Sequence, residues 1–131
     1  MSRKRENVRQ CKAIRQLIDD NKYTKALELI DAIPLEEVGS LDDLYRYAEL
    51  YEKAERMDKK KEIFYHIYHR THSRYMLNRL LRLTIRMGDM EEARELYFAY
   101  EVAGPITLDT FELRYLLAKA EGEPPERLIQ I

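Results

Sequence analysis

Three histidines have the spacing in this chain that comes nearest to a metal site. His66, His69 and His72 follow one another at intervals of three residues. On a helix the first two would lie about 60° apart and, with a nearby acid, could hold a metal ion. However, histidines near a helix C-terminus also interact favourably with the helix dipole, and the sequence RTHS is expected to leave the helix before His72. We therefore predict no metal site and no other cofactor.

The remaining nucleophiles do not form a catalytic pattern. Ser40 is expected to cap a helix, and no serine lies in a nucleophile-elbow sequence. Cys11 has no base nearby in the sequence. The four glycines are isolated at expected helix breaks, so neither common phosphate-binding loop is present. Pairs of carboxylates are easy to find among 24 acidic residues, and on a charged helical surface most of them are solvated. The sequence predicts a protein that is not an enzyme.

The elements that must position these residues are helices. The chain has 131 residues, enough for one domain, and its composition is 45% hydrophobic and 36% charged, rich in residues that favour helix. Apolar residues recur every three or four positions in eight stretches. The expected helices cover about residues 6–20, 23–33, 40–54, 59–71, 73–87, 90–103 and 108–121, with a last one from about 124.

Helix-start and helix-break signals separate these stretches. Ser40 is expected to cap a helix with Asp43 at the reciprocal position, and Asp109 is expected to do the same with Glu112. Gly88 is expected to break the helix that precedes it. The following residues are expected to form the apolar face of the helix after Asp109: Phe111, Tyr115, Leu116 and Ala118. Pro124 and Pro125 suit the first turn of a final helix.

The helices recur in pairs. First helices begin near residues 41, 73 and 108, and second helices begin near residues 23, 59, 90 and 124. These starts fit a period of about 34 residues, which is the tetratricopeptide spacing. In GDMEEARELYFAYEVAGP the matching positions are Gly88, Met90, Ala93, Tyr97 and Pro105, and in NKYTKALELIDAI they are Tyr23, Ala26, Ile30 and Ile33. On these residues the chain resembles the tetratricopeptide family.

The resemblance implies an all-α fold, a right-handed α-α solenoid of about four antiparallel helix pairs. The pairs would cover approximately residues 5–34, 40–71, 73–104 and 108–131 of a single domain, 1–131. The resemblance also implies a non-enzymatic scaffold or adaptor that binds a peptide segment of another protein in a concave groove. Such a partner could be acidic or carry a free carboxylate.

The residues expected to line this groove are polar and aromatic. Asn78, Arg82 and Arg86 are spaced one helical turn apart, so they share one face, and by resemblance they form a clamp for a carboxylate. Tyr45 and Tyr75 fall off the apolar stripes and could stack against a ligand. An alternative use of the arginines is an electrostatic seam, in which they meet acids of neighbouring repeats.

The distribution of charge along the chain allows two alternative functions. Residues 1–18 carry a net charge of +5 and residues 59–86 carry +7, while residues 19–55 carry −7 and residues 87–131 carry −6. The basic blocks, with tyrosine stacking, would allow RNA or other nucleic acid to bind, although a pI near 6.3 disfavours this alternative. A third alternative is self-association of a longer repeat protein, giving a homo-oligomer through the C-terminal helix pair.

The expected location is the cytoplasm. A single cysteine, Cys11, excludes an intramolecular disulfide and fits a reducing compartment. The N-terminal residues lack the apolar core of a signal peptide, and no stretch approaches the ~18 uninterrupted apolar residues of a membrane span. No membrane contact is expected.

Overall fold

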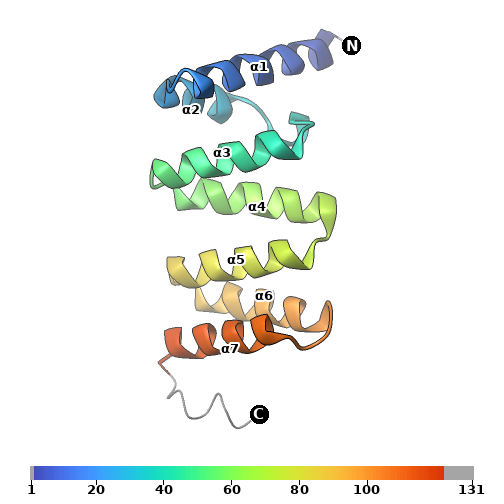
Figure 1. Ribbon diagram of the computed structural model, residues 1–131, viewed down its shortest axis with the longest axis vertical. Helices are drawn as coiled ribbons and strands as arrows, with labels where there is room; N and C mark the ends of the chain where they lie inside the picture. Colours follow the sequence, from blue (N-terminus) through green and yellow to red (C-terminus); the bar gives the residue numbers. More distant parts are fainter. Residues whose placement is uncertain (1, 123–131) are drawn as a thin grey trace. The chain divides into compact units, whose positions relative to one another are not determined.

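The computed structural model describes residues 2–122, with side chains from Val8 onward, and this range is mostly helical. Within this range there are seven α-helices and one short 3-10 helix, and no strand (Figure 1). The elements are α1 (Ser2–Asp19), α2 (Tyr23–Ala32), η1 (Leu35–Glu37), α3 (Leu41–Lys53), α4 (Met57–Thr71), α5 (Arg74–Met87), α6 (Met90–Val102) and α7 (Leu108–Ala120). The all-α prediction is therefore confirmed, while the helix expected from Pro124 lies outside the described residues.

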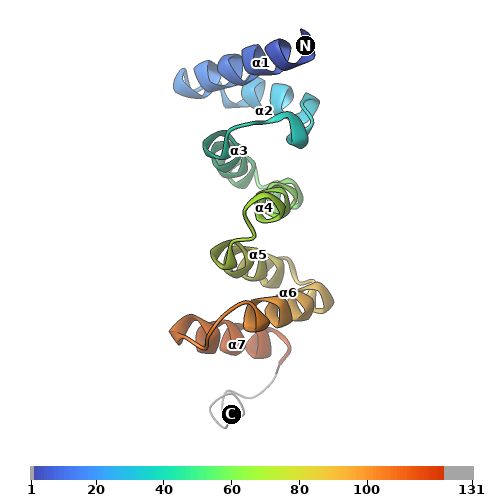
Figure 2. The same cartoon turned by 90° about the vertical axis from the view of Figure 1, so that its right-hand side faces the viewer.

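The chain divides into two compact units, Met1–Ile67 and Tyr68–Ile131. In the first unit, α2 packs against both α1 and α3. In the second unit, α5, α6 and α7 each pack against the other two. Successive helices within a unit reverse direction, as Figures 1 and 2 show.

The expected apolar stripes form the core of each unit. The first unit buries Ile14 on α1, Ala26 on α2 and Tyr47 on α3, and the second buries Leu80 on α5 and Ala93 on α6. Ala26 and Ala93 are fully buried at the small-residue positions of the sequence pattern, so their size lets neighbouring helices approach closely. Among the tyrosines of these helices, Tyr47, Tyr51 and Tyr100 are buried, Tyr97 is half-buried and Tyr115 is exposed.

The expected start of α7 near residue 108 is confirmed, but the predicted cap residue was wrong. Thr107, and not Asp109, precedes its first turn, and the Thr107 N–H donates to the Thr110 hydroxyl at 3.0 Å. Asp109 lies inside the first turn, where a negative charge is favourable because of the helix dipole. Threonine and aspartate are both good N-caps, and in the structure Thr107 takes this position.

The predicted apolar face of α7 was also largely wrong. The side that packs against α5 and α6 buries Thr110, Leu113, Leu117 and Ala118. Of the predicted residues only Ala118 belongs to this face, while Phe111 and Tyr115 are exposed. This helix is apolar on two opposite sides, so its periodicity does not identify the side that faces the core.

Left-handed residues end several of the helices. Gly88 has a φ of +83° at the end of α5, where its N–H bonds back to the carbonyls of Thr84 and Ile85, and this confirms the predicted break. Asn21, Glu55 and His72 adopt φ of +60°, +59° and +52°, although none of them is a glycine. His72 thus lies beyond the end of α4, as the sequence predicted.

Candidate functional site

One tyrosine and three arginines form a row on the side of α5 that lies away from its buried leucines. Tyr75, Arg79, Arg82 and Arg86 are spaced four, three and four residues apart, so they share one side of the helix, opposite the buried Leu80. We call these four residues the basic face of α5. The Tyr75 side chain is 64% exposed, and the Arg79 guanidinium lies over its ring at 5.8 Å. An aromatic ring and guanidinium groups are therefore presented together.

Arg82 is held in place by two neighbours. Its Nε donates to Oδ1 of Asn78 at 2.6 Å, and its Nη1 donates to Oε1 of Glu112 on α7 at 2.9 Å. The hydrogen bond and the charge of Arg82 hold the pKa of the Glu112 carboxyl below its usual range. Arg82 therefore meets an acid of a neighbouring helix, as the seam alternative requires, and Asn78, which is buried, orients it.

The predicted site residues fall in both units. Asn78, Arg82, Arg86 and Tyr75 all belong to α5 in the second unit. Tyr45 belongs to α3 in the first unit and is half-buried. The structure therefore brings four of the five residues onto one helix.

Arg74 has an interhelical role that the sequence analysis missed. Its Nε donates to the Tyr100 carbonyl at 3.0 Å, and its Nη1 donates to the Pro105 carbonyl at 2.8 Å. Its guanidinium also lies 4.1 Å from the centre of the Tyr100 ring. A cation in the first turn of a helix opposes the helix dipole, which is a signal that the side chain has partners elsewhere. Arg74 binds the end of α6 to the loop that follows it.

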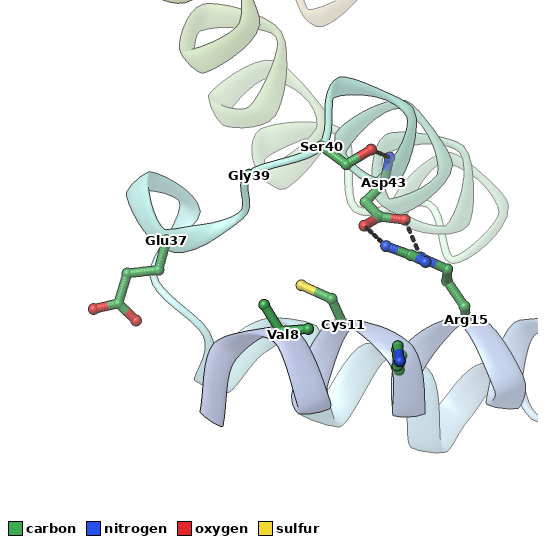
Figure 3. Close-up of a pocket in the computed structure, with 8 residues that line it drawn as sticks. Val8, Cys11, Arg15, Glu37, Gly39, Ser40 and Asp43 are labelled. Atoms are coloured by element: carbon green, nitrogen blue, oxygen red, sulfur yellow. Dashed lines mark hydrogen bonds and ion pairs between the residues drawn. The ribbon is translucent and has the colours of Figure 1, made fainter. Parts of the chain in front are cut away.

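A small pocket lies in the first unit between α1 and the segment that leads into α3 (Figure 3). Its volume is about 220 Å³, below the ~300–1,000 Å³ of usual small-molecule sites. The lining residues are Val8, Cys11, Lys12, Arg15, Glu37, Gly39, Ser40 and Asp43.

The polar wall of this pocket is a structural ion pair. Nε and Nη2 of Arg15 donate to the two carboxylate oxygens of Asp43 at 2.8 and 2.9 Å (Figure 3). The Ser40 hydroxyl accepts the Asp43 N–H at 3.4 Å, so Ser40 caps α3 as predicted. The reciprocal half of the predicted capping box was wrong, because the Asp43 carboxylate is turned to Arg15.

The Tyr47 hydroxyl lies buried near this ion pair and has no hydrogen-bond partner among the described residues. Burial raises its pKa, and the adjacent Cys11 thiol and Asp43 carboxylate raise it further. Tyr47 is therefore neutral in the folded protein at physiological pH. The pocket has the character of an interhelical packing site and not of a reaction centre.

Within residues 2–122, no three side chains of His, Cys, Asp or Glu are grouped as a metal site would require. No helix of this range combines the length and apolar content that a membrane span needs. Comparison with protein-family models, curated proteins and solved structures finds no match to the chain. The case for a function therefore rests on its own residues, above all on the basic face of α5.

Proposed function

We propose that this chain is a non-enzymatic protein-binding module, in which the basic face of α5 takes an acidic segment or a free carboxylate of another protein. The observation that carries the proposal is the alignment of Tyr75, Arg79, Arg82 and Arg86 on one side of a single helix. Guanidinium groups bind carboxylates through paired, charge-assisted hydrogen bonds. An exposed tyrosine adds apolar contact at a low entropic cost.

The proposal includes the architecture that the sequence resembles, a right-handed tetratricopeptide-like solenoid of about four helix pairs in a cytoplasmic protein. The helix pairs, the fully buried Ala26 and Ala93, and the left-handed Gly88 support this reading. In such a solenoid the first helix of each pair faces the concave groove, and α5 is the first helix of the third pair. The basic face would then line the groove.

Tyr75, Arg82 and Arg86 would play different parts in recognition. Arg82 already bonds to Asn78 and Glu112, so its contribution is to hold α7 beside α5 and to keep the local potential positive. Tyr75 and Arg86 are exposed and lie at opposite ends of the basic face. Together they set the length of the segment that could bind.

A direct test measures binding of a fluorescent glutamate-rich peptide, in a free-carboxylate form and an amidated form, to the full chain. Arg86→Glu and Tyr75→Ala should each weaken binding by about tenfold, the effect of losing one charge-assisted contact. Arg46→Glu on α3 is the matched control, because Arg46 is also an exposed helical arginine. It should leave the affinity unchanged.

Three outcomes would contradict the proposal. The first is no binding of either peptide, and the second is equal weakening by Arg46→Glu and Arg86→Glu. The third is tighter binding of a single-stranded RNA than of the peptide, with the steep salt dependence that phosphate contacts produce. That result would assign the basic face to nucleic acid.

A further inference from the structure

The carboxylate of Glu112 is bound in the middle of the basic face of α5. Arg82 stands there between Arg79, three residues before it, and Arg86, four residues after it. Nη1 of Arg82 donates to Oε1 of Glu112 at 2.9 Å. One of the guanidinium groups that the proposed function assigns to a carboxylate of a partner therefore already holds a carboxylate of the protein itself.

Glu112 holds Arg82 by a single contact. Nε of Arg82 donates to Oδ1 of the buried Asn78 at 2.6 Å, so the two terminal nitrogens are the part of the guanidinium that remains for a carboxylate. Glu112 uses one of these nitrogens through one oxygen. Arg15 and Asp43, by contrast, are joined through two nitrogens and both oxygens, which is the stronger arrangement.

Other contacts hold α7 in place. Its buried side packs against α5 and α6 through Thr110, Leu113, Leu117 and Ala118. The side chains of Arg82 and Glu112 are 34% and 56% exposed, and ion pairs as exposed as this one contribute little to stability. The pair therefore matters less for folding than for the charge that the basic face presents.

An acidic ligand on the basic face would meet Glu112 in two unfavourable ways. A ligand carboxylate would compete with Glu112 for Nη1 of Arg82, and its charge would be repelled by the charge of Glu112 at the same place. Like charges placed against a partner are a general means by which proteins lower the affinity for it. Both effects act on acidic ligands, and neither acts on a neutral one.

We propose that Glu112 is an internal competitor, whose carboxylate masks Arg82 from acidic partners and so limits the affinity of the basic face. This inference rests on the proposed function, because it concerns the same acidic ligand. It goes further by assigning the control of affinity to a residue of α7, outside the basic face. Without this carboxylate, Arg82 becomes an additional contact for the ligand.

The test measures binding of the fluorescent glutamate-rich peptide to the full chain and its variants at one salt concentration. Glu112→Ala should tighten binding by about fivefold, the effect of one exposed charge pair. Asp109→Ala is the matched control, because Asp109 is also an exposed acid of α7, while Arg82 pairs with Glu112 and not with Asp109. This control should leave the affinity nearly unchanged.

A double-variant comparison separates masking from a general change in charge. Arg82→Ala should weaken binding only slightly in the unmodified chain, but in the Glu112→Ala background it should remove the whole gain. Circular dichroism of each variant verifies that α7 remains folded. A gain that survives Arg82→Ala, or equal gains from Asp109→Ala and Glu112→Ala, would overturn the inference.

Failure of this inference can be told apart from failure of the proposed function. If the unmodified chain binds the peptide and Arg86→Glu weakens binding, but Glu112→Ala has no effect, Glu112 does not mask Arg82 and the proposed function stands. If neither the unmodified chain nor Glu112→Ala binds the peptide, the proposed function is wrong, and the masking role of Glu112 is wrong with it.

Discussion

Arginine side chains join helices at several places in the described part of the chain. Arg15 bonds to Asp43, Arg82 bonds to Glu112, and Arg74 bonds to the carbonyls of Tyr100 and Pro105. In each case the guanidinium uses more than one of its donors, which fixes its direction as well as its distance.

The Arg15–Asp43 pair should contribute measurably to stability. In Arg15→Ala, the buried Asp43 carboxylate would lose both of its guanidinium donors, so we expect the free energy of unfolding to fall by about 1–3 kcal/mol. Urea unfolding followed by circular dichroism measures this change. Lys12→Ala is the control, since Lys12 is an exposed neighbour on α1, and an equal loss in both variants would argue against a role for the pair.

Because of Asp31, the free energy of unfolding should decrease at acidic pH. Burial opposes ionisation of its carboxyl, but hydrogen bonds from Arg56, at 2.9 Å, and from the Tyr51 hydroxyl outweigh burial and lower its pKa from the usual 3.8. A lowered pKa gives stability that is fully present above pH 3.8 and is lost as the pH falls below it. Asp31→Asn should therefore flatten the acid limb of a plot of urea midpoint against pH. If the urea midpoint of Asp31→Asn fell with acid as steeply as that of the unmodified protein, Asp31 would not be the cause of the pH dependence.

The candidate site was predictable only within one helix. The positions of Asn78, Arg82 and Arg86 on one side of α5 followed from their spacing, because helical geometry fixes it. The pairing of Arg82 with Glu112 did not follow from spacing, because 30 residues separate them and the register between two helices depends on packing. Helical periodicity predicts which residues share one side of a helix, but it does not predict which residues of another helix pack against that side.

At the scale of elements, α7 shows the same limit. Most helix boundaries were predictable within a few residues, since Pro34, Gly88 and Gly104 mark ends that backbone chemistry imposes. α7 was predicted in position but not in orientation, because leucines and aromatics occupy both of its sides. The choice of the Leu113 side is made by packing against α5 and α6.

The connection between α6 and α7 depends on a close approach to Gly104. A methyl group there would lie 2.6 Å from Nη1 of Arg74, so Gly104→Ala should displace the guanidinium from the Tyr100 and Pro105 carbonyls. We expect a loss of about 1–2 kcal/mol in the free energy of unfolding. Thermal unfolding measures it. Gly39→Ala is the control, because a methyl group at Gly39 meets no atom within 4 Å.

At the scale of the whole molecule, the chain consists of two compact units whose division falls within α4. The all-helical class followed from composition and periodicity, because abundant helix formers and a 3.6-residue pattern leave little room for sheet. The division within α4 did not follow from the sequence, which shows no break there. The division at Ile67 depends on how the helices pack, and no local feature of the sequence marks it.

A perturbation in one unit should remain largely within it. Hydrogen–deuterium exchange of Gly104→Ala should show faster exchange in α6 and α7, because those helices lose the Arg74 contacts, and unchanged exchange in α1, α2 and α3. Peptide-resolved mass spectrometry measures both regions in one sample. Equal acceleration throughout the chain would show that the two units unfold as a single cooperative block.

The left-handed residue between α3 and α4 offers a means of engineering the protein. Glu55 adopts a φ of +59°, a conformation that costs a side-chain-bearing residue about 1 kcal/mol or more and glycine almost nothing. Asn21 and His72 share the geometry, but the Asn21 side chain accepts a hydrogen bond from Tyr23, and the His72 ring contacts Tyr68. Glu55→Gly should therefore raise the melting temperature without removing such a contact, and calorimetry would measure the gain. In a variant with this added stability, the charge reversal at Arg86 could be tested without loss of folded protein.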